Sequence, residues 1–151
     1  MDWLHLTLLT IMPGLELRAA IPYALFNGDG IAGILFVLLL NVLIFFPVWV
    51  GLLLLYRFAE NWWIVKNVVN KIRKRGEPYV KKYGIPGIAI FVAIPLPGSG
   101  VYSGTLLAWL LGLEWRKSFV ACAVGVIFAA IAVYLISTGA LSALKILSFS
   151  T

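Results

Sequence analysis

Two long stretches without a charged residue constrain this chain most. Residues 31–56 hold 26 consecutive uncharged residues, and residues 118–138 hold 21. A helix needs about 20 mostly apolar residues to cross a hydrocarbon core about 30 Å thick. Of the 151 residues, 62% are hydrophobic and only 12% are charged, whereas soluble domains average about 25% charged residues. The sequence therefore predicts an all-α integral membrane protein, one membrane domain over residues 1–151, in which both stretches are full transmembrane helices.

Two further apolar stretches, residues 3–26 and 85–113, are interrupted by proline and glycine. The first is broken by the Pro-Gly pair at residues 13–14, and the second by the run PLPGSG at residues 95–100. Proline removes a backbone donor and clashes with the preceding helical turn, and glycine eases a break in the helix. Both stretches are therefore predicted to be helix–break–helix segments, with their breaks near the middle of the bilayer.

The basic residues indicate the topology. Eight of the twelve lysines and arginines lie between Arg57 and Lys82, which is typical of a cytoplasmic loop and favours a membrane protein over one that binds nucleic acid. If both broken segments are re-entrant hairpins, ten basic residues lie inside, whereas four full crossings would move Arg116 and Lys117 outside. We therefore expect two re-entrant hairpins in the cytoplasmic membrane of a prokaryote, with loop 57–83 in the cytoplasm and both termini outside.

Part of this loop has the pattern of an amphipathic helix that lies on the membrane surface. Within residues 60–75, one face carries Ile64, Val65, Val68, Val69 and Ile72, and the other carries Lys66, Asn67, Asn70, Lys71 and Lys74. Such a helix lies in the headgroup layer with its cations near anionic lipid, so membrane lipid is an expected partner. Trp3, Trp109 and Trp115 fit an interfacial aromatic belt, and Asn41 is expected to form a hydrogen bond between helices.

The two broken segments align when the sequence is shifted by 84 residues. Pro13 and Gly14 then fall on Pro97 and Gly98, and two series with a spacing of four follow. These series are Glu16, Ala20, Ala24 and Gly28 in the first copy, and Gly100, Gly104, Ala108 and Gly112 in the second. A spacing of four places each series on one helix face. Small residues there, as at Ala121, Gly125 and Ala129, let membrane helices approach closely.

The cytoplasmic loop between the two copies gives the second copy the opposite orientation. The predicted fold is two inverted repeats, each a re-entrant helical hairpin followed by a full transmembrane helix, joined by the basic amphipathic helix. Repeat one covers residues 3–56, the linker 57–83 and repeat two 84–140, and a short C-terminal tail covers 141–151. In proteins with inverted repeats, substrate and ion sites lie at the midplane between discontinuous helices.

Three sequence segments resemble those of a known family. They are PGLELRAAIP at residues 13–22, IPLPGSGVYSG at 94–104 and AWLLG at 108–112, and they resemble the signatures of the putative small multidrug export protein family over nearly the whole chain. The resemblance implies drug export. More distantly, the chain resembles the DedA (VTT-domain) superfamily, in which two re-entrant hairpins face each other and some members translocate polyprenyl-phosphate or other lipids.

Glu16 and Arg18 are the strongest candidates for transport and ion coupling. A charge at the bilayer centre costs a few kcal/mol, so such residues usually have a functional or a pairing role. A buried carboxylate can take up and release protons, as a coupling site must. The alternative is a structural ion pair that clamps the hairpin.

The breaks themselves are candidate substrate sites. Each break leaves backbone N–H groups of the next half-helix without partners, and these donors and the helix dipole favour an anion. Glu16 favours a cation instead, and the sequence leaves this conflict open. The predicted substrate-binding residues are Pro13, Gly14, Pro97, Gly98, Ser99, Gly100, Tyr102 and Ser103.

These observations predict a transporter. The leading hypothesis is a proton- or ion-coupled transporter of a small amphipathic compound or drug, with a midplane site between the hairpins. The alternatives are a flippase or scramblase for an anionic lipid headgroup, resembling DedA, and a membrane scaffold that transports nothing. No nucleophile–base pair or metal-ligand set is visible, so neither an enzyme nor a cofactor is expected. Because two spans offer little protein to shield two hairpins, we expect a homo-oligomer, most simply a dimer.

Overall fold

The computed structural model describes residues 3–59, 63–94 and 100–149, and all regular structure within these ranges is α-helical. The helices are α1 (Trp3–Ile11), α2 (Glu16–Phe26), α3 (Gly30–Ala59), α4 (Trp63–Ala93), α5 (Val101–Leu110) and α6 (Trp115–Phe149). The prediction of an all-α chain is confirmed for these residues.

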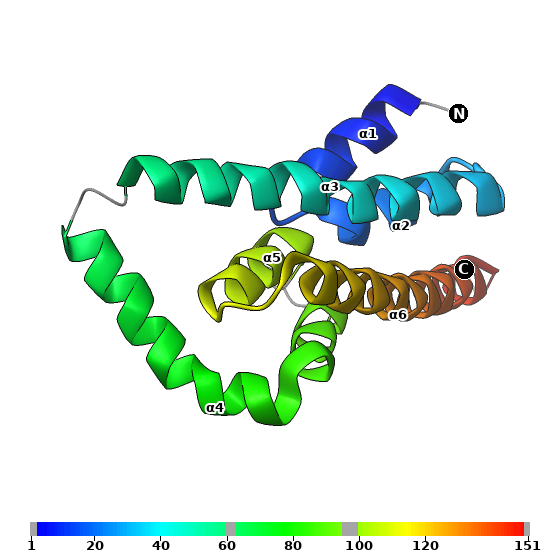
Figure 1. Cartoon of the computed structure of the whole chain (residues 1–151). Helices are drawn as coiled ribbons and strands as arrows, with labels where there is room; N and C mark the ends of the chain where they lie inside the picture. The colour runs from blue at the N-terminus through cyan, green and yellow to red at the C-terminus, as the bar shows by residue number, and fades with distance from the viewer. Residues whose placement is uncertain (1–2, 60–62, 95–99, 150–151) are drawn as a thin grey trace.

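Helices α3 and α6 are the long apolar helices of the structure. Gly30–Ala59 and Trp115–Ala140 are long and apolar enough to cross a membrane, and they contain the two predicted spans. The two helices contact each other and run in opposite directions, as Figure 1 shows. Residues 141–149, predicted to be a tail, continue α6 instead, because the sequence after Gly139 contains no proline or glycine that would end the helix.

Both predicted breaks interrupt the helices. Helices α1 and α2 have 9 and 11 residues, or about 14 and 17 Å at 1.5 Å per residue, so neither alone crosses a core of about 30 Å. They contact each other and both contact α3. In the second half, α4 ends at Ala93 and α5 begins at Val101. Residues 95–99 of the proline-rich run lie outside the described residues.

Helix α4 is longer than the predicted amphipathic helix and is bent. It runs to Ala93, and Gly84 within it has φ 37° and ψ −121°, a left-handed region that glycine tolerates best. In Figure 1 the first half of α4 runs from the upper left to the bottom of the view, and the half after the bend returns toward α6. On the predicted apolar face Val69 is buried, whereas Val68 is 51% exposed.

Small residues allow the second half of α4 to pack closely on α6. The predicted stripe is confirmed, because Ala121, Gly125 and Ala129 are all buried. A Cβ atom at Gly125 would lie 2.7 Å from the carbonyl oxygen of Ala89 and 2.6 Å from the side chain of Val92. Any side chain at residue 125 would therefore push the two helices apart.

Helices α2 and α5 end in the same way. The N–H of Asp29 donates to Ala24 at 3.0 Å, and the N–H of Leu113 donates to Ala108 at 3.0 Å. Gly28 and Gly112, with φ of +70° and +77°, occupy the turn where helices commonly place a left-handed glycine. The donor, the acceptor and the glycine of the turn after α5 each lie 84 residues after the corresponding residue of the turn after α2. The two halves therefore share this turn in the predicted register.

Candidate functional site at the two helix breaks

Glu16 is the first residue of α2 and reaches the other half of the chain. Its side chain is buried, with 3% exposed, and its carboxylate Oε2 accepts a hydrogen bond from the N–H of Val101 at 3.0 Å. Glu16 also has φ +46°, and no other non-glycine residue in the described part of the chain has a positive φ. A non-glycine residue in this region is strained, and such strain clusters at functional sites.

The carboxylate of Glu16 lies at the N-terminus of α5. The free N–H groups and the dipole of that helix end stabilise a negative charge. Gly100, just before the helix, leaves room for it, because a Cβ atom there would lie 1.9 Å from Glu16 Oε2 and 2.3 Å from Oε1. The contact between the breaks therefore requires glycine at residue 100.

Arg18 bonds to the helix end on the other side of the second break. Its Nη2 donates to the carbonyl oxygen of Ile94 at 3.2 Å, directly after the last residue of α4. Carbonyl groups at a helix C-terminus carry partial negative charge, which favours a cation. The charges of Glu16 and Arg18 also interact electrostatically with each other. The negative charge of Glu16 thus lies at the N-terminus of α5, and the positive charge of Arg18 lies at the C-terminus of α4. Each charge is opposite in sign to the helix dipole at that end.

One side chain that follows the second break forms a hydrogen bond with the first break. The hydroxyl of Tyr102 donates to the carbonyl oxygen of Ile11 at 2.5 Å, and Ile11 is the last residue of α1. Three side chains, Glu16, Arg18 and Tyr102, therefore join four helix ends. We call this group of contacts the break contact.

The expectation of open anion sites at both breaks is wrong for the groups that the structure describes. At α5 the carboxylate of Glu16 takes the position expected for a substrate anion. At α2 the N–H groups of Leu15 and Glu16 both donate to the carbonyl of Met12, and the N–H of Arg18 donates to Leu15. The chain itself satisfies these donors, since a turn after the Pro-Gly pair brings carbonyl groups within reach.

The other predicted site residues have different positions. Pro13 and Gly14 are exposed in the first break, where Gly14 has φ +92°. The hydroxyl of Ser103 accepts a hydrogen bond from the N–H of Gly100 at 2.9 Å and so caps α5. Pro97, Gly98 and Ser99 lie outside the described residues.

An apolar cavity borders the break contact. Its volume is about 430 Å³, within the range of about 300–1,000 Å³ that is typical of small-molecule sites. Tyr102 and Ile11, which form the hydrogen bond between the breaks, both line it. Its lining residues are Ile11, Leu40, Leu43, Ile44, Pro47, Val48 and Tyr102.

Asn41 does not form the predicted hydrogen bond between helices. The residue is fully buried in α3, yet neither its Oδ1 nor its Nδ2 has a hydrogen-bond partner within the described part of the chain. An amide buried in this way costs about 1–3 kcal/mol. The sequence shows a polar residue within an apolar span but not which groups surround it.

Sequence reasoning found the three side chains of the break contact but not their partners. The partners are the carbonyl oxygens of Ile11 and Ile94 and the N–H of Val101. Every residue carries such backbone groups, so no residue type marks them. No group of three His, Cys, Asp or Glu side chains that could hold a metal ion occurs among the described residues.

Comparison with known families identifies the family of this chain. The family model described as "Putative small multi-drug export protein" matches residues 16–132, a range that begins at Glu16, directly after the first break, and includes the second break and the first half of α6. The chain belongs to this family. The comparison with curated proteins found no match, and neither did the comparison with solved structures. The family and the two long apolar helices identify a membrane protein.

Proposed function

We propose that this chain is a proton-coupled exporter of amphipathic cations and that Glu16 is its coupling residue. The observation that carries the proposal is the hydrogen bond from the N–H of Val101 to the buried carboxylate of Glu16. This carboxylate joins the two halves of the chain, and the backbone of Glu16 is strained at φ +46°. A group that holds two halves together more strongly while it is charged can link their movement to a proton.

The proposed cycle follows from the chemistry of the break contact. While Glu16 is ionised, it stabilises the N-terminus of α5 and keeps the breaks together. A proton or a cationic substrate at Glu16 weakens this bond, so the two halves can separate. The apolar cavity beside Tyr102 would hold the apolar part of the substrate. Proton and substrate compete for one carboxylate, as they must if the protein exchanges one for the other across the membrane.

A transport assay with matched variants tests this proposal. Full-length protein is reconstituted in liposomes with an acidic interior, and uptake of ethidium, an amphipathic fluorescent cation, is followed. Wild type and Glu114→Gln should accumulate ethidium, since Glu114 is an exposed residue whose carboxylate pairs with Lys117 at 3.4 Å. Glu16→Gln should lose at least nine-tenths of the gradient-driven uptake. Equal uptake by wild type and Glu16→Gln would reject the coupling role.

One observation favours a second candidate, a lipid flippase or scramblase of the DedA type. A wholly apolar cavity of about 660 Å³ between α4 and α6 reaches Ile94, whose carbonyl accepts the hydrogen bond from Arg18. An acyl chain could lie there with its headgroup near the break contact. The test is movement of a fluorescent phospholipid between the leaflets of the same liposomes. A scaffold without transport would leave both assays at the level of protein-free liposomes.

The proposal includes re-entrant hairpins arranged as inverted repeats. The short α1 and α2, the shared turns after α2 and α5, and the opposite directions of α3 and α6 support it. Single cysteines at residues 28, 75 and 116, introduced after Cys122→Ser, test the topology with a membrane-impermeant thiol reagent. Hairpins place residues 75 and 116 on one side and residue 28 on the other. Four full crossings would instead place residue 116 on the side opposite to residue 75.

We also propose that the exporter works as a homodimer. Only 28% of the apolar stretch of α3 and 39% of that of α6 are buried within one chain, so much of each span is left to contact lipid or a second copy. Cross-linking in native membranes followed by mass determination tests this. A single monomer band at all cross-linker concentrations would contradict the dimer.

A further inference from the structure

The first half of α4 lines a third cavity, which is far from the break contact in sequence and differs in chemistry from the two apolar cavities. Its volume is about 650 Å³. All but one of its lining residues are cationic or carry an amide, and the exception comes from the turn after α5. They are Asn67, Asn70, Lys71, Arg73, Lys74 and Leu111. We call this cavity the α4 basic pocket.

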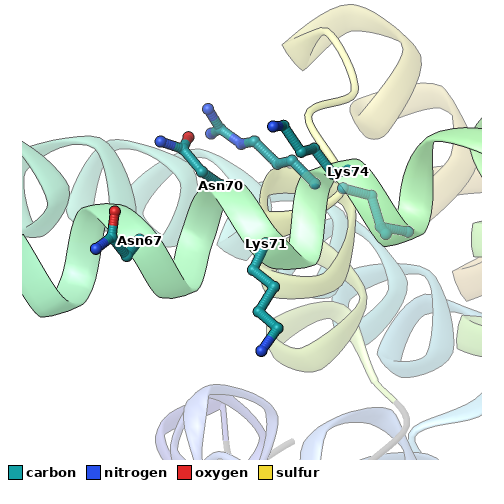
Figure 2. Close-up of a pocket in the computed structure, with 6 residues that line it drawn as sticks. Asn67, Asn70, Lys71 and Lys74 are labelled. Atoms are coloured by element: carbon teal, nitrogen blue, oxygen red, sulfur yellow. The ribbon is translucent and has the colours of Figure 1, made fainter.

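Helical spacing explains why these side chains gather. Asn67, Asn70, Lys71 and Lys74 are three, four and seven residues apart, which places them on one face of the helix. Figure 2 shows them along the first half of α4, with Asn70 and Lys74 extending toward the same side and Lys71 toward the other. None of the described residues that line the pocket is acidic.

Arg73 is held in place by aromatic rings from other helices. Its guanidinium carbon lies 5.3 Å from the ring centroid of Trp109 in α5 and 5.8 Å from that of Tyr56 in α3, within the range of cation–π attraction. Trp109, predicted to lie in an interfacial belt, is buried here, with 7% exposed. The Nε of Arg73 is buried and has no hydrogen-bond partner within the described part of the chain. The guanidinium is therefore fixed while one of its N–H groups is left to donate.

The charge of the whole chain is concentrated around this pocket. The basic and acidic residues between Arg57 and Lys82 give a net charge of +6, which equals that of the full sequence. Three cations in one pocket repel each other unless an anion lies between them. A phosphate group suits such a site because arginine donates to it with two N–H groups and lysine adds a point charge.

Exposed aromatic residues shortly before the pocket residues in sequence indicate that the phosphate belongs to a membrane lipid. Phe58 at the end of α3 is 82% exposed and Trp63 at the start of α4 is 76% exposed. Aromatic and basic residues together on a helix surface are typical of the headgroup region of a bilayer, and basic pockets beside membrane helices bind anionic headgroups. We propose that the α4 basic pocket binds the phosphate headgroup of an anionic phospholipid. This inference does not depend on the transport function.

Charge-matched variants test the proposal on the full-length protein in a neutral detergent. Dihexanoylphosphatidylglycerol is the probe, and native mass spectrometry measures its binding. Lys71→Gln/Lys74→Gln removes two cations from the pocket. Lys66→Gln/Lys82→Gln removes two exposed cations from the same helix that do not line it. Binding should be about 30-fold weaker in the first variant than in wild type, and nearly unchanged in the second.

Three results would overturn the proposal. Equal weakening in both double variants would mean that charge attracts lipid to the whole helix without a pocket. Equal binding of dihexanoylphosphatidylcholine, which carries no net charge, would exclude selection for an anionic headgroup. If inorganic phosphate displaced the lipid at concentrations as low as those at which the lipid binds, the pocket would be a site for free phosphate. Thermal unfolding of the first double variant at the wild-type temperature, in the same detergent, serves as the check that it folds.

Discussion

The break between α1 and α2 contributes two charged side chains to the break contact, whereas the break before α5 contributes mainly backbone groups. At the same position of the two copies the first has Glu16 and the second has Gly100. A large charged residue on one side requires the smallest residue on the other, since a Cβ atom at Gly100 would overlap the carboxylate. The two halves therefore share a common plan but have complementary roles.

This difference shows why the two copies are not interchangeable. The first break provides charges of both signs, and the second provides the two helix ends that these charges match. Among the described residues of the break contact, Glu16 is the one carboxylate. Substitutions in each break separate the contributions of the two sides.

Substitution of Gly100 should have the largest effect on stability. Gly100→Ala places a methyl group where the carboxylate of Glu16 lies, so it should lower the free energy of unfolding by ~3 kcal/mol through overpacking and loss of the bond to Val101. The control is Gly51→Ala in α3, where the added Cβ meets no atom within 4 Å. Thermal unfolding in detergent measures both. A Gly100→Ala protein as stable as the control would contradict the position of Glu16.

Loss of the Arg18 side chain should have a smaller effect. Arg18→Gln removes the charged donor to the carbonyl of Ile94, and hydrogen bonds to charged groups contribute about 2 kcal/mol. The double variant Glu16→Gln/Arg18→Gln should lose less than the sum of the two single losses, because both residues stabilise one contact. Unfolding of all three variants, with the exposed Arg116→Gln as control, measures this coupling. Strict additivity would show that the two charges act independently.

Removal of one hydroxyl should have the smallest effect. Tyr102→Phe keeps the ring but loses the donor to Ile11, and one neutral hydrogen bond contributes about 1 kcal/mol. Tyr134→Phe on an exposed part of α6 should leave stability unchanged. If Tyr102→Phe destabilised the protein more than Arg18→Gln, the second break would contribute more than backbone groups, and the comparison above would fail.

Much of the fold could be predicted because it depends on local properties of the sequence. A run of about 20 apolar residues has few stable positions other than a membrane-spanning helix, so α3 and α6 could be predicted. The Pro-Gly pair at residues 13–14 interrupts a helix wherever it occurs. The spacing of four among Ala121, Gly125 and Ala129 reports a close helix contact. Each of these signals can be read within one turn or one span.

The tertiary structure alone decided how the candidate sites are built. Glu16 was identified because a charge in an apolar segment needs a reason, but its partner is a backbone N–H 85 residues away, which no residue type marks. In the same way, the rings around Arg73 come from α3 and α5, far from it in sequence. Asn41 was predicted to have a partner, and its buried amide has none within the described part of the chain. The sequence by itself determined which groups are costly to bury, and the tertiary structure decided which of them are compensated, because compensation depends on distance in space.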